Sequence, residues 1–220
     1  DAEAGFKSPL DKLRGVSATY NNYIQIVASA DSGIKTMADL KGKRISVGAP
    51  KSGTELNARA ILKAAGLSYA DFAKVEYLPF GESVELIKNR QLDVTLQSAG
   101  LGVASIRDLA TSVKIVVVAI PAEVVAKVGD AAYQSAIIPA NTYQGQTTDV
   151  PTAAIPNFLV SHAGVPADLV CKMTKSMYDN LDMMVAAHAA AKAIKRENAE
   201  KGMPLPLHPG AEKYYKSGSC

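Results

Sequence analysis

The strongest constraint on the fold is a regular alternation of apolar runs and helix-like segments between Arg44 and Ile120. Such an alternation implies a mostly parallel sheet with helices on both faces, and ligands bind such sheets beyond the carboxyl ends of the strands. The sequence therefore predicts an α/β fold with its site at one sheet edge. The predicted strands are 44–47, 75–78, 92–96 and 114–120, and helices are predicted at 56–65, from 82 onward, and at 104–110.

The loop 47–55 joins the first of these strands to the first helix and is built of small residues. A helix start presents unpaired N–H groups and the positive end of the helix dipole, and Ser52 and Thr54 add hydroxyl donors there. Ser52 and Glu55 also have the spacing of a capping box, which explains both residues without a ligand. Gly53 permits the turn in either case. Our hypothesis is that this loop holds the acidic group of a small ligand.

This loop is not a nucleotide-binding P-loop. Gly48 and Gly53 have the required separation, but Thr54 stands where the phosphate-binding lysine is needed. The turn Gln97–Gly100 follows the third strand of the alternation and is expected at the same sheet edge as the loop 47–55.

Outside the alternation, the patterns predict elements of both kinds. The helix that begins at Pro166 is expected to turn Leu169, Met173, Met177 and Leu181 inward. The remaining predictions are a helix-like segment at 9–16, a strand at 23–28, a helical turn at 36–40, a short helix at 122–132, a turn-rich linker over 137–151, a strand at 152–160, an Ala-rich helix to about 199, and a last helical turn at 211–216.

Composition narrows the possible partners. The chain has 220 residues, of which 48% are hydrophobic, so it can bury a sizeable core. The formal net charge is only +3, and the Lys and Arg residues are scattered among acids, which argues against a nucleic acid partner. The most apolar stretch, 115–120, is too short to span a membrane and stops at Pro121.

No pattern in the sequence calls for catalysis or a metal. The histidines, His162, His188 and His208, lack metal-binding spacing with each other or with a cysteine. Glu82 and Glu85 share a helix face but stand among basic residues, which favours a solvated face over an acid/base pair. We therefore expect no metal, no cofactor and no enzymatic chemistry.

The two cysteines lie far apart in the sequence. Cys171 sits in an apolar helical pattern, which predicts a buried, inert thiol, and Cys220 is the last residue, expected to be mobile. A disulfide between them is an open alternative that nothing in the pattern supports.

Several segments in order resemble one family. Residues 39–47, then Ser52–Thr54, then a helix that ends at Gly66, resemble type II periplasmic solute-binding proteins. The closer resemblance is to the TAXI type of TRAP transporter receptor, the immunogenic-protein family. Three more stretches support it: 19–28 for the crossover segment, 92–94 followed by Gly100 for the second ligand loop, and 206–216 for the C-terminal signature.

The resemblance implies a type II periplasmic-binding-protein-like fold of two α/β lobes that close on a ligand through a two-strand hinge. Residues 1–33 would form a lobe-one segment and hinge, 34–136 lobe two, and 137–220 the return hinge and the C-terminal part of lobe one. It implies capture of a small organic acid in the periplasm, with glutamate, glutamine or a dicarboxylate as candidates, and delivery to TRAP-type membrane permease subunits.

Two departures from the family pattern qualify this expectation. The signal peptide and the first lobe-one strand of family members do not appear in this chain, so lobe one is expected to be incomplete. A lobe that lacks strands would expose sheet edges, from which we expect self-association. In the second loop, Ala99–Gly102 replaces the usual glycine-rich turn, and Gln97 replaces a bulky residue.

The resemblance also suggests ligand-facing residues. Tyr20 would be an aromatic contact, although hinge packing explains it as well, and Phe80 is a weaker candidate that a buried turn also explains. Ser52, Gly53 and Thr54 would form the anion cradle, and Gln97 and Ser98 would be polar contacts from the second loop. The alternative functions are the effector-sensing domain of a transcription regulator and an enzyme on the same fold.

Overall fold

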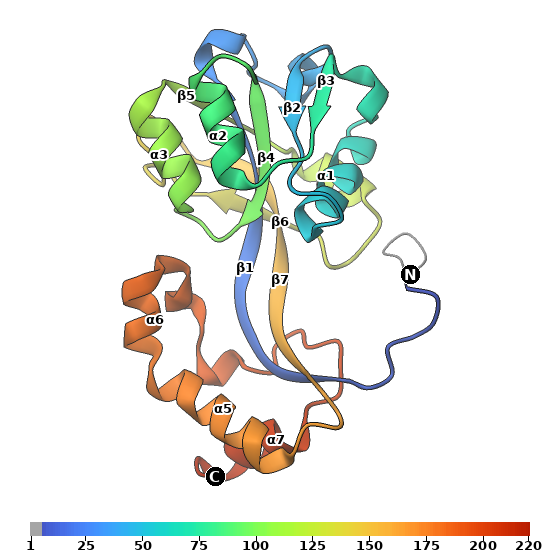
Figure 1. Ribbon diagram of the computed structural model, residues 1–220, viewed down its shortest axis with the longest axis vertical. Coiled ribbons are helices and arrows are strands. Elements are labelled where there is room, and N and C mark those ends of the chain that lie inside the picture. Colours follow the sequence, from blue (N-terminus) through green and yellow to red (C-terminus); the bar gives the residue numbers. More distant parts are fainter. Residues whose placement is uncertain (1–5) are drawn as a thin grey trace. The chain divides into compact units, whose positions relative to one another are not determined.

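The computed structural model describes residues 6–220, which form two compact units (Figure 1). Unit 1 comprises residues 6–21 together with Pro156–Cys220, and unit 2 comprises Asn22–Ile155. The long strands β1 (Leu13–Ser29) and β7 (Val150–His162) each contribute residues to both units. The predicted α/β class is confirmed, and the chain passes from one unit to the other along two strands.

Within the described residues, the strands form one seven-stranded mixed sheet in the order β3-β2-β4-β1-β7-β6, with β5 paired to β1. β2 is parallel to β3 and to β4, whereas β1 is antiparallel to β4 and β5, and β6 is antiparallel to β7. The prediction of a mostly parallel sheet is therefore wrong, because β1 runs through the middle in the opposite direction. The other strands are β2 (Arg44–Ser46), β3 (Lys74–Glu76), β4 (Val94–Ala99), β5 (Ile115–Val118) and β6 (Gln134–Ile138).

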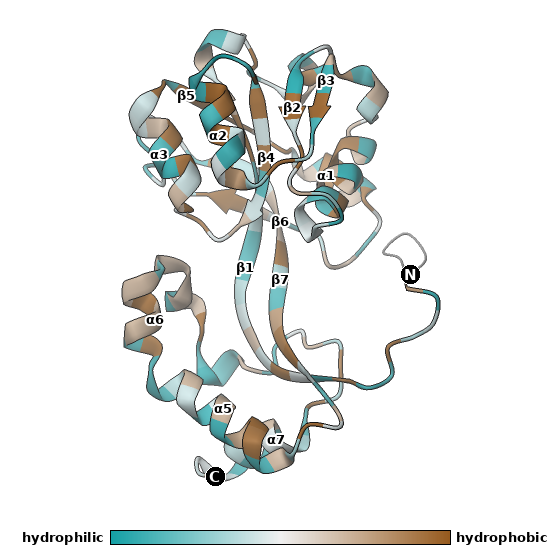
Figure 2. Cartoon of the chain, in the orientation of Figure 1, coloured by the Kyte–Doolittle hydropathy of each residue, from teal (hydrophilic) through white to brown (hydrophobic). Residues whose placement is uncertain are grey.

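Two hydrophobic cores lie on the two faces of the unit 2 sheet. Leu96 of β4 packs with Ile61 of α1 and Val125 of α4, whereas Val84 of α2 packs with Ile106 of α3. Figure 2 shows the hydrophobic residues of α2 in brown and its hydrophilic residues in teal. The helices are α1 (Gly53–Ala64), α2 (Phe80–Lys88), α3 (Ala104–Ser112) and α4 (Ala122–Lys127).

Unit 1 has a much smaller core, which centres on Val16, Val170 and Ala211. Its helices are α5 (Ala167–Asp179), α6 (Leu181–Ala187) and α7 (Pro209–Ser217). α5 and α7 approach closely at Gly210, where an added Cβ would lie 2.1 Å from the carbonyl oxygen of Ala167. A glycine is therefore required at this helix contact.

The predicted inner face of α5 is wrong. Leu169 and Met173 are about half exposed, at 50% and 51%, whereas Val170, Cys171 and Thr174 are buried. Cys171 forms a disulfide with Cys220, so the prediction of an inert thiol and a mobile C-terminus is also wrong. The bond and the contact with α7 both lie on the face of α5 that carries Val170 and Cys171, so that face is the covered one.

The Ala-rich helix also ends earlier than predicted. α6 stops at Ala187, and two short 3-10 turns, Ala189–Ala193 and Arg196–Asn198, take its place. The backbone of His188 is extended, and its Nδ1 accepts a hydrogen bond from the amide of Ala190 at 3.1 Å. A side chain that caps the next turn competes with helix continuation.

Three shorter segments also differ from the predictions. Residues 13–16 are strand rather than helix because they begin β1, where Val16 faces the core. The predicted linker begins with β6, because residues 134–138 pair with β7. Gln97–Ala99 belongs to β4 rather than to a turn, because these residues pair with β1.

Candidate ligand-binding site

The carboxyl ends of β2 and β4 meet at one edge of the unit 2 sheet. The chain leaves β2 for α1, which packs in the core of one face, and leaves β4 for α3, which packs in the core of the other. The point where successive connections diverge to opposite faces is where open α/β sheets bind ligands. The loops 47–52 and 100–103 lie at this point.

Ser52 caps α1, but it does not form the full capping box. Its Oγ accepts a hydrogen bond from the amide of Glu55 at 3.2 Å. The carboxylate of Glu55 instead accepts hydrogen bonds from Arg59 Nε at 2.6 Å and from the Tyr69 hydroxyl at 3.0 Å. Burial and the hydrogen bond to Glu55 raise the pKa of Tyr69. Glu55 is 3% exposed, and its carboxylate is engaged by these two partners instead of by the start of α1.

The first turn of α1 keeps donors available. The amides of Gly53 and Thr54 have no acceptor within the helix, as at every helix start. Within residues 6–220, the Thr54 hydroxyl has no hydrogen-bond partner either. Gly48 has φ 92°, and a Cβ there would lie 2.6 Å from Thr54 Cγ2. Gly48 therefore lets the loop fold closely over Thr54.

Ser98 is tied to this same helix. Asn57, one turn into α1, donates from Nδ2 to Ser98 Oγ at 3.0 Å, and the Tyr133 hydroxyl donates to Asn57 Oδ1 at 2.9 Å. Burial raises the pKa of Tyr133, and nearby Asp130 adds to this effect. Neither Asn57 nor Tyr133 was predicted from the sequence, and only the position of Asn57 one turn beyond the loop could have pointed to it.

Gln97 faces the other side of the sheet. Its Oε1 accepts a hydrogen bond from Ser105 Oγ of α3 at 2.7 Å, and its fully buried Nε2 has no partner in the described part of the chain. Adjacent residues of a strand point to opposite faces, so Gln97 and Ser98 do not form one patch. Ser98 is the one placed beside α1.

A buried pair, Tyr143 and Gln25, holds the loop after β4 through hydrogen bonds. The Tyr143 hydroxyl donates to Gln25 Oε1 and accepts from the amide of Gly102 at 3.1 Å, while Gln25 Nε2 donates to the carbonyl of Ala99 at 3.1 Å. Burial raises the pKa of Tyr143 to about 12. Gln25 was also missed, although an amide between Ile24 and Ile26 in an apolar strand is a usable signal.

The remaining candidates lie elsewhere. Tyr20 is a half-buried residue in the unit 1 part of β1, and Phe80 is the partly buried first residue of α2. His188 and His208 cap helical turns through Nδ1. Over residues 6–220 no group of His, Cys, Asp or Glu side chains is arranged to hold a metal ion.

The fold and this edge define a two-unit α/β protein. The NMT1-like family matches residues 1–217, and the chain belongs to that family. None of the helices in the described residues is long and apolar enough to cross a membrane.

The chain is also similar to solved structures, at low identity. The periplasmic aliphatic sulphonate binding protein SsuA from Escherichia coli is 17% identical over 100% of this chain and 62% of its own, with a TM-score of 0.43. An ancestral arginine-binding protein bound to glutamine is 17% identical over 82% of this chain and 63% of its own, with a TM-score of 0.45. A substrate-binding protein of an ABC uptake transporter from Streptococcus pneumoniae, with bound histidine, is 16% identical over 87% of this chain and 68% of its own, with a TM-score of 0.49. This chain thus spans less than two thirds of the first two.

Proposed function

We propose that this chain belongs to a periplasmic solute receptor of the TAXI type, which captures a small organic acid and delivers it to TRAP-type permease subunits. Glutamate, glutamine and a dicarboxylate are the candidate ligands. The proposal is supported by the sequence resemblance and by family membership. Such a receptor works by binding and conformational closure, without chemistry on its ligand.

The start of α1 is the observation that carries the ligand assignment. The amides of Gly53 and Thr54 and the Thr54 hydroxyl are donors without acceptors in the described residues, and the Asn57–Ser98 pair lies next to them on the same sheet face. Donors at the positive end of a helix dipole favour a carboxylate. Exposed Lys51, with φ 58°, adds a cation beside Ser52.

The disulfide supports the proposed compartment. Cys171 and Cys220 are paired, and such bonds persist in oxidising compartments such as the bacterial periplasm. A periplasmic receptor meets this condition, whereas a regulator in the cytosol does not.

The test is calorimetric titration of the chain with glutamate, glutamine and succinate. We expect at least one of them to bind. Gly53→Pro should weaken that binding by about 10- to 100-fold, because it removes one amide donor to a charged group. Proline is favoured at the first helical position, and the extended backbone of Ser52 (φ −83°, ψ 160°) suits a following proline, so the fold is retained.

Gly53→Ala is the matched control. An added Cβ meets no atom within 4 Å, and the variant keeps the amide that proline removes, so its affinity should stay close to that of the parent chain. Equal affinities for the proline and alanine variants would exclude the α1 amide as a ligand contact. Absence of binding of all three acids by the folded chain would overturn the proposed ligand class.

A further inference from the structure

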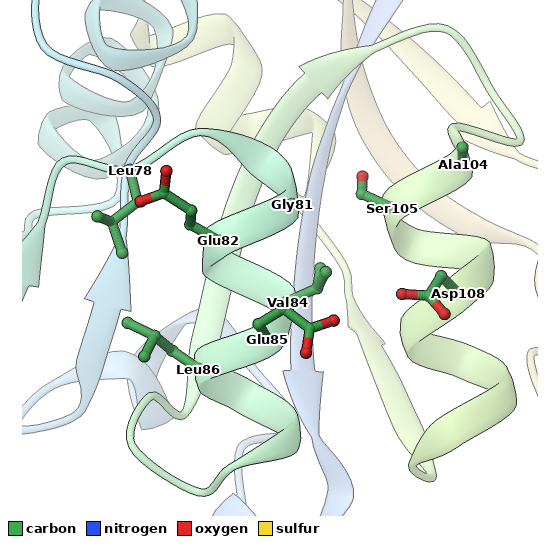
Figure 3. Close-up of a pocket in the computed structure, with 9 residues that line it drawn as sticks. All are labelled: Leu78, Gly81, Glu82, Val84, Glu85, Leu86, Ala104, Ser105 and Asp108. Atoms are coloured by element: carbon green, nitrogen blue, oxygen red, sulfur yellow. The ribbon is translucent and has the colours of Figure 1, made fainter.

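A groove of about 760 Å³ lies on the α2–α3 side of unit 2, away from the start of α1. Figure 3 shows the residues that line it: Leu78, Gly81, Glu82, Val84, Glu85, Leu86, Ala104, Ser105 and Asp108. The lining is mostly apolar, and the carboxylates of Glu85 and Asp108 face each other between the two helices. We refer to this surface as the α2–α3 groove.

Gly81 opens the groove. An added Cβ at this position would meet no atom within 4 Å, so the space above this turn of α2 is empty. In Figure 3, Leu78 and Leu86 lie on one flank of α2, and Ala104 and Ser105 lie on α3 beyond the other flank. Gly81 lines the same groove as these residues, so a side chain added there would enter it.

The groove carries negative charge. Glu82, Glu85 and Asp108 supply three carboxylates, and Lys88 Nζ lies 2.8 Å from Glu85 and 2.5 Å from Asp108. The contacts with Asp108 and then Glu85 raise the pKa of Lys88, which keeps it charged. One lysine balances only one of the three carboxylates. Glu82 is exposed and has no ion-pair partner in the described residues.

We propose that the α2–α3 groove docks a helix of a partner protein that presents apolar side chains flanked by Lys or Arg. Its apolar side chains would cover Leu78, Leu86 and the turn at Gly81, and its basic groups would reach the carboxylates. Apolar anchors give such a contact its affinity, and charges at the rim give it specificity and speed.

The dimensions suit this occupant. α2 and α3 have nine residues each, which corresponds to about 13 Å at 1.5 Å per residue, or about two and a half turns of a docked helix. The proposal does not depend on the proposed solute receptor function, because none of the groove residues belongs to α1 or its loop.

The probe is a fluorescein-labelled amphipathic peptide of about 14 residues, composed of Leu and Lys at helical spacing. Its affinity for the full chain is measured by fluorescence anisotropy, and its site by amide chemical shifts in NMR spectra. We expect saturable binding with the largest shifts on α2 and α3. A matched peptide with Glu in place of Lys should not bind.

The decisive variant is Gly81→Leu, which fills the groove. It should weaken peptide binding at least about 10-fold, as a misplaced side chain in a packed contact does. Leucine is a better helix former than glycine, so the variant does not weaken the fold. The control Ala126→Leu adds the same side chain at an exposed position of α4 and should bind as the parent chain does.

Charge variants give a second, independent test. Glu82→Gln and Asp108→Asn should each weaken binding by about 2- to 5-fold, as exposed ion pairs do, and Glu123→Gln on α4 should have no effect. Shifts that map to the exposed Leu169 and Met173 of α5, or unchanged binding by Gly81→Leu, would overturn the proposal.

Discussion

Unit 2 and unit 1 are stabilised in different ways. Unit 2 has a hydrophobic core on each face of its sheet, which includes fully buried Ile61, Leu96 and Leu109. Unit 1 has a small core around Val170 and leaves Leu169, Met173 and Met183 exposed. Hydrophobic burial is the dominant favourable contribution to folding, so unit 1 must depend on other interactions.

Those interactions are visible in unit 1. The Cys171–Cys220 disulfide links α5 to the chain end. Tyr178 stacks on Tyr214 with ring centroids 5.8 Å apart, and the Arg196 guanidinium lies 4.8 Å from the Tyr214 centroid. A unit with little buried apolar surface can therefore still be ordered by a covalent link and an aromatic cluster. Three predictions test this contrast.

The largest effect should come from removing the disulfide. Cys220→Ser opens a loop with a sequence separation of 49 residues, which should destabilise unit 1 by about 4 kcal/mol by loop-closure entropy. Hydrogen exchange followed by mass spectrometry should show faster exchange in α5 and α7 and unchanged exchange in β4. Equal acceleration in both units would show that they unfold together and would contradict a separate stabilisation of unit 1 by the disulfide.

An intermediate effect should appear in unit 2 at alkaline pH. Burial raises the pKa of Tyr143 to about 12 in the folded chain, from about 10 in the unfolded chain. The neutral form is therefore favoured by folding, and the resulting stability is complete below about pH 10 and lost as pH rises to about 12. This amounts to about 2–3 kcal/mol.

Denaturant unfolding followed by circular dichroism from pH 8 to 12 measures this loss. Tyr143→Phe should lower stability at pH 8, because it removes a buried hydrogen bond, and should flatten the decline above pH 10. Tyr77→Phe, at an exposed tyrosine, is the control and should keep the full decline. An equally steep decline in Tyr143→Phe would contradict the assignment.

The smallest effect should come from the aromatic cluster. The Tyr178 hydroxyl shares a hydrogen bond of 2.6 Å with the Ser17 hydroxyl, so Tyr178→Phe should destabilise unit 1 by about 1 kcal/mol and keep the ring stacking. This loss of stability is measured as the increase in the hydrogen-exchange rates of the α5 amides. A change above that of Cys220→Ser would mean that the cluster, rather than the disulfide, stabilises unit 1.

The sequence predicted the elements of unit 2 best, because their local and tertiary signals agree. The helix after the loop was expected to begin with Ser52 as its capping residue, and Ser52 caps α1 in the structure. The inner face of α5 was wrong because the pattern shows which residues are apolar, whereas the disulfide and α7 decide which face is covered. The mixed sheet was missed because strand direction depends on pairing partners.

The candidate site was predictable only in part. The loop around Ser52 and Thr54 could be found because strand, loop and helix are contiguous in the sequence. Asn57 and Tyr133 could not, because their hydrogen bond joins residues 76 positions apart. Gln97 and Ser98 were grouped because they are adjacent, and the alternation of side chains along β4 separates them.

The shared strand β1 sets the order in which the chain can fold during synthesis. Unit 2 is one continuous segment that ends at Ile155, so all its residues are made before residues 156–220 of unit 1. The first half of β1 can complete its contacts only after residues 207 and 215 are made. The Tyr215 hydroxyl donates a hydrogen bond to the Val16 carbonyl at 2.6 Å, and Gly15 forms a β-bridge with Leu207. Domains fold as units as they emerge, so the unit 1 part of β1 completes its contacts after the unit 2 part of the same strand.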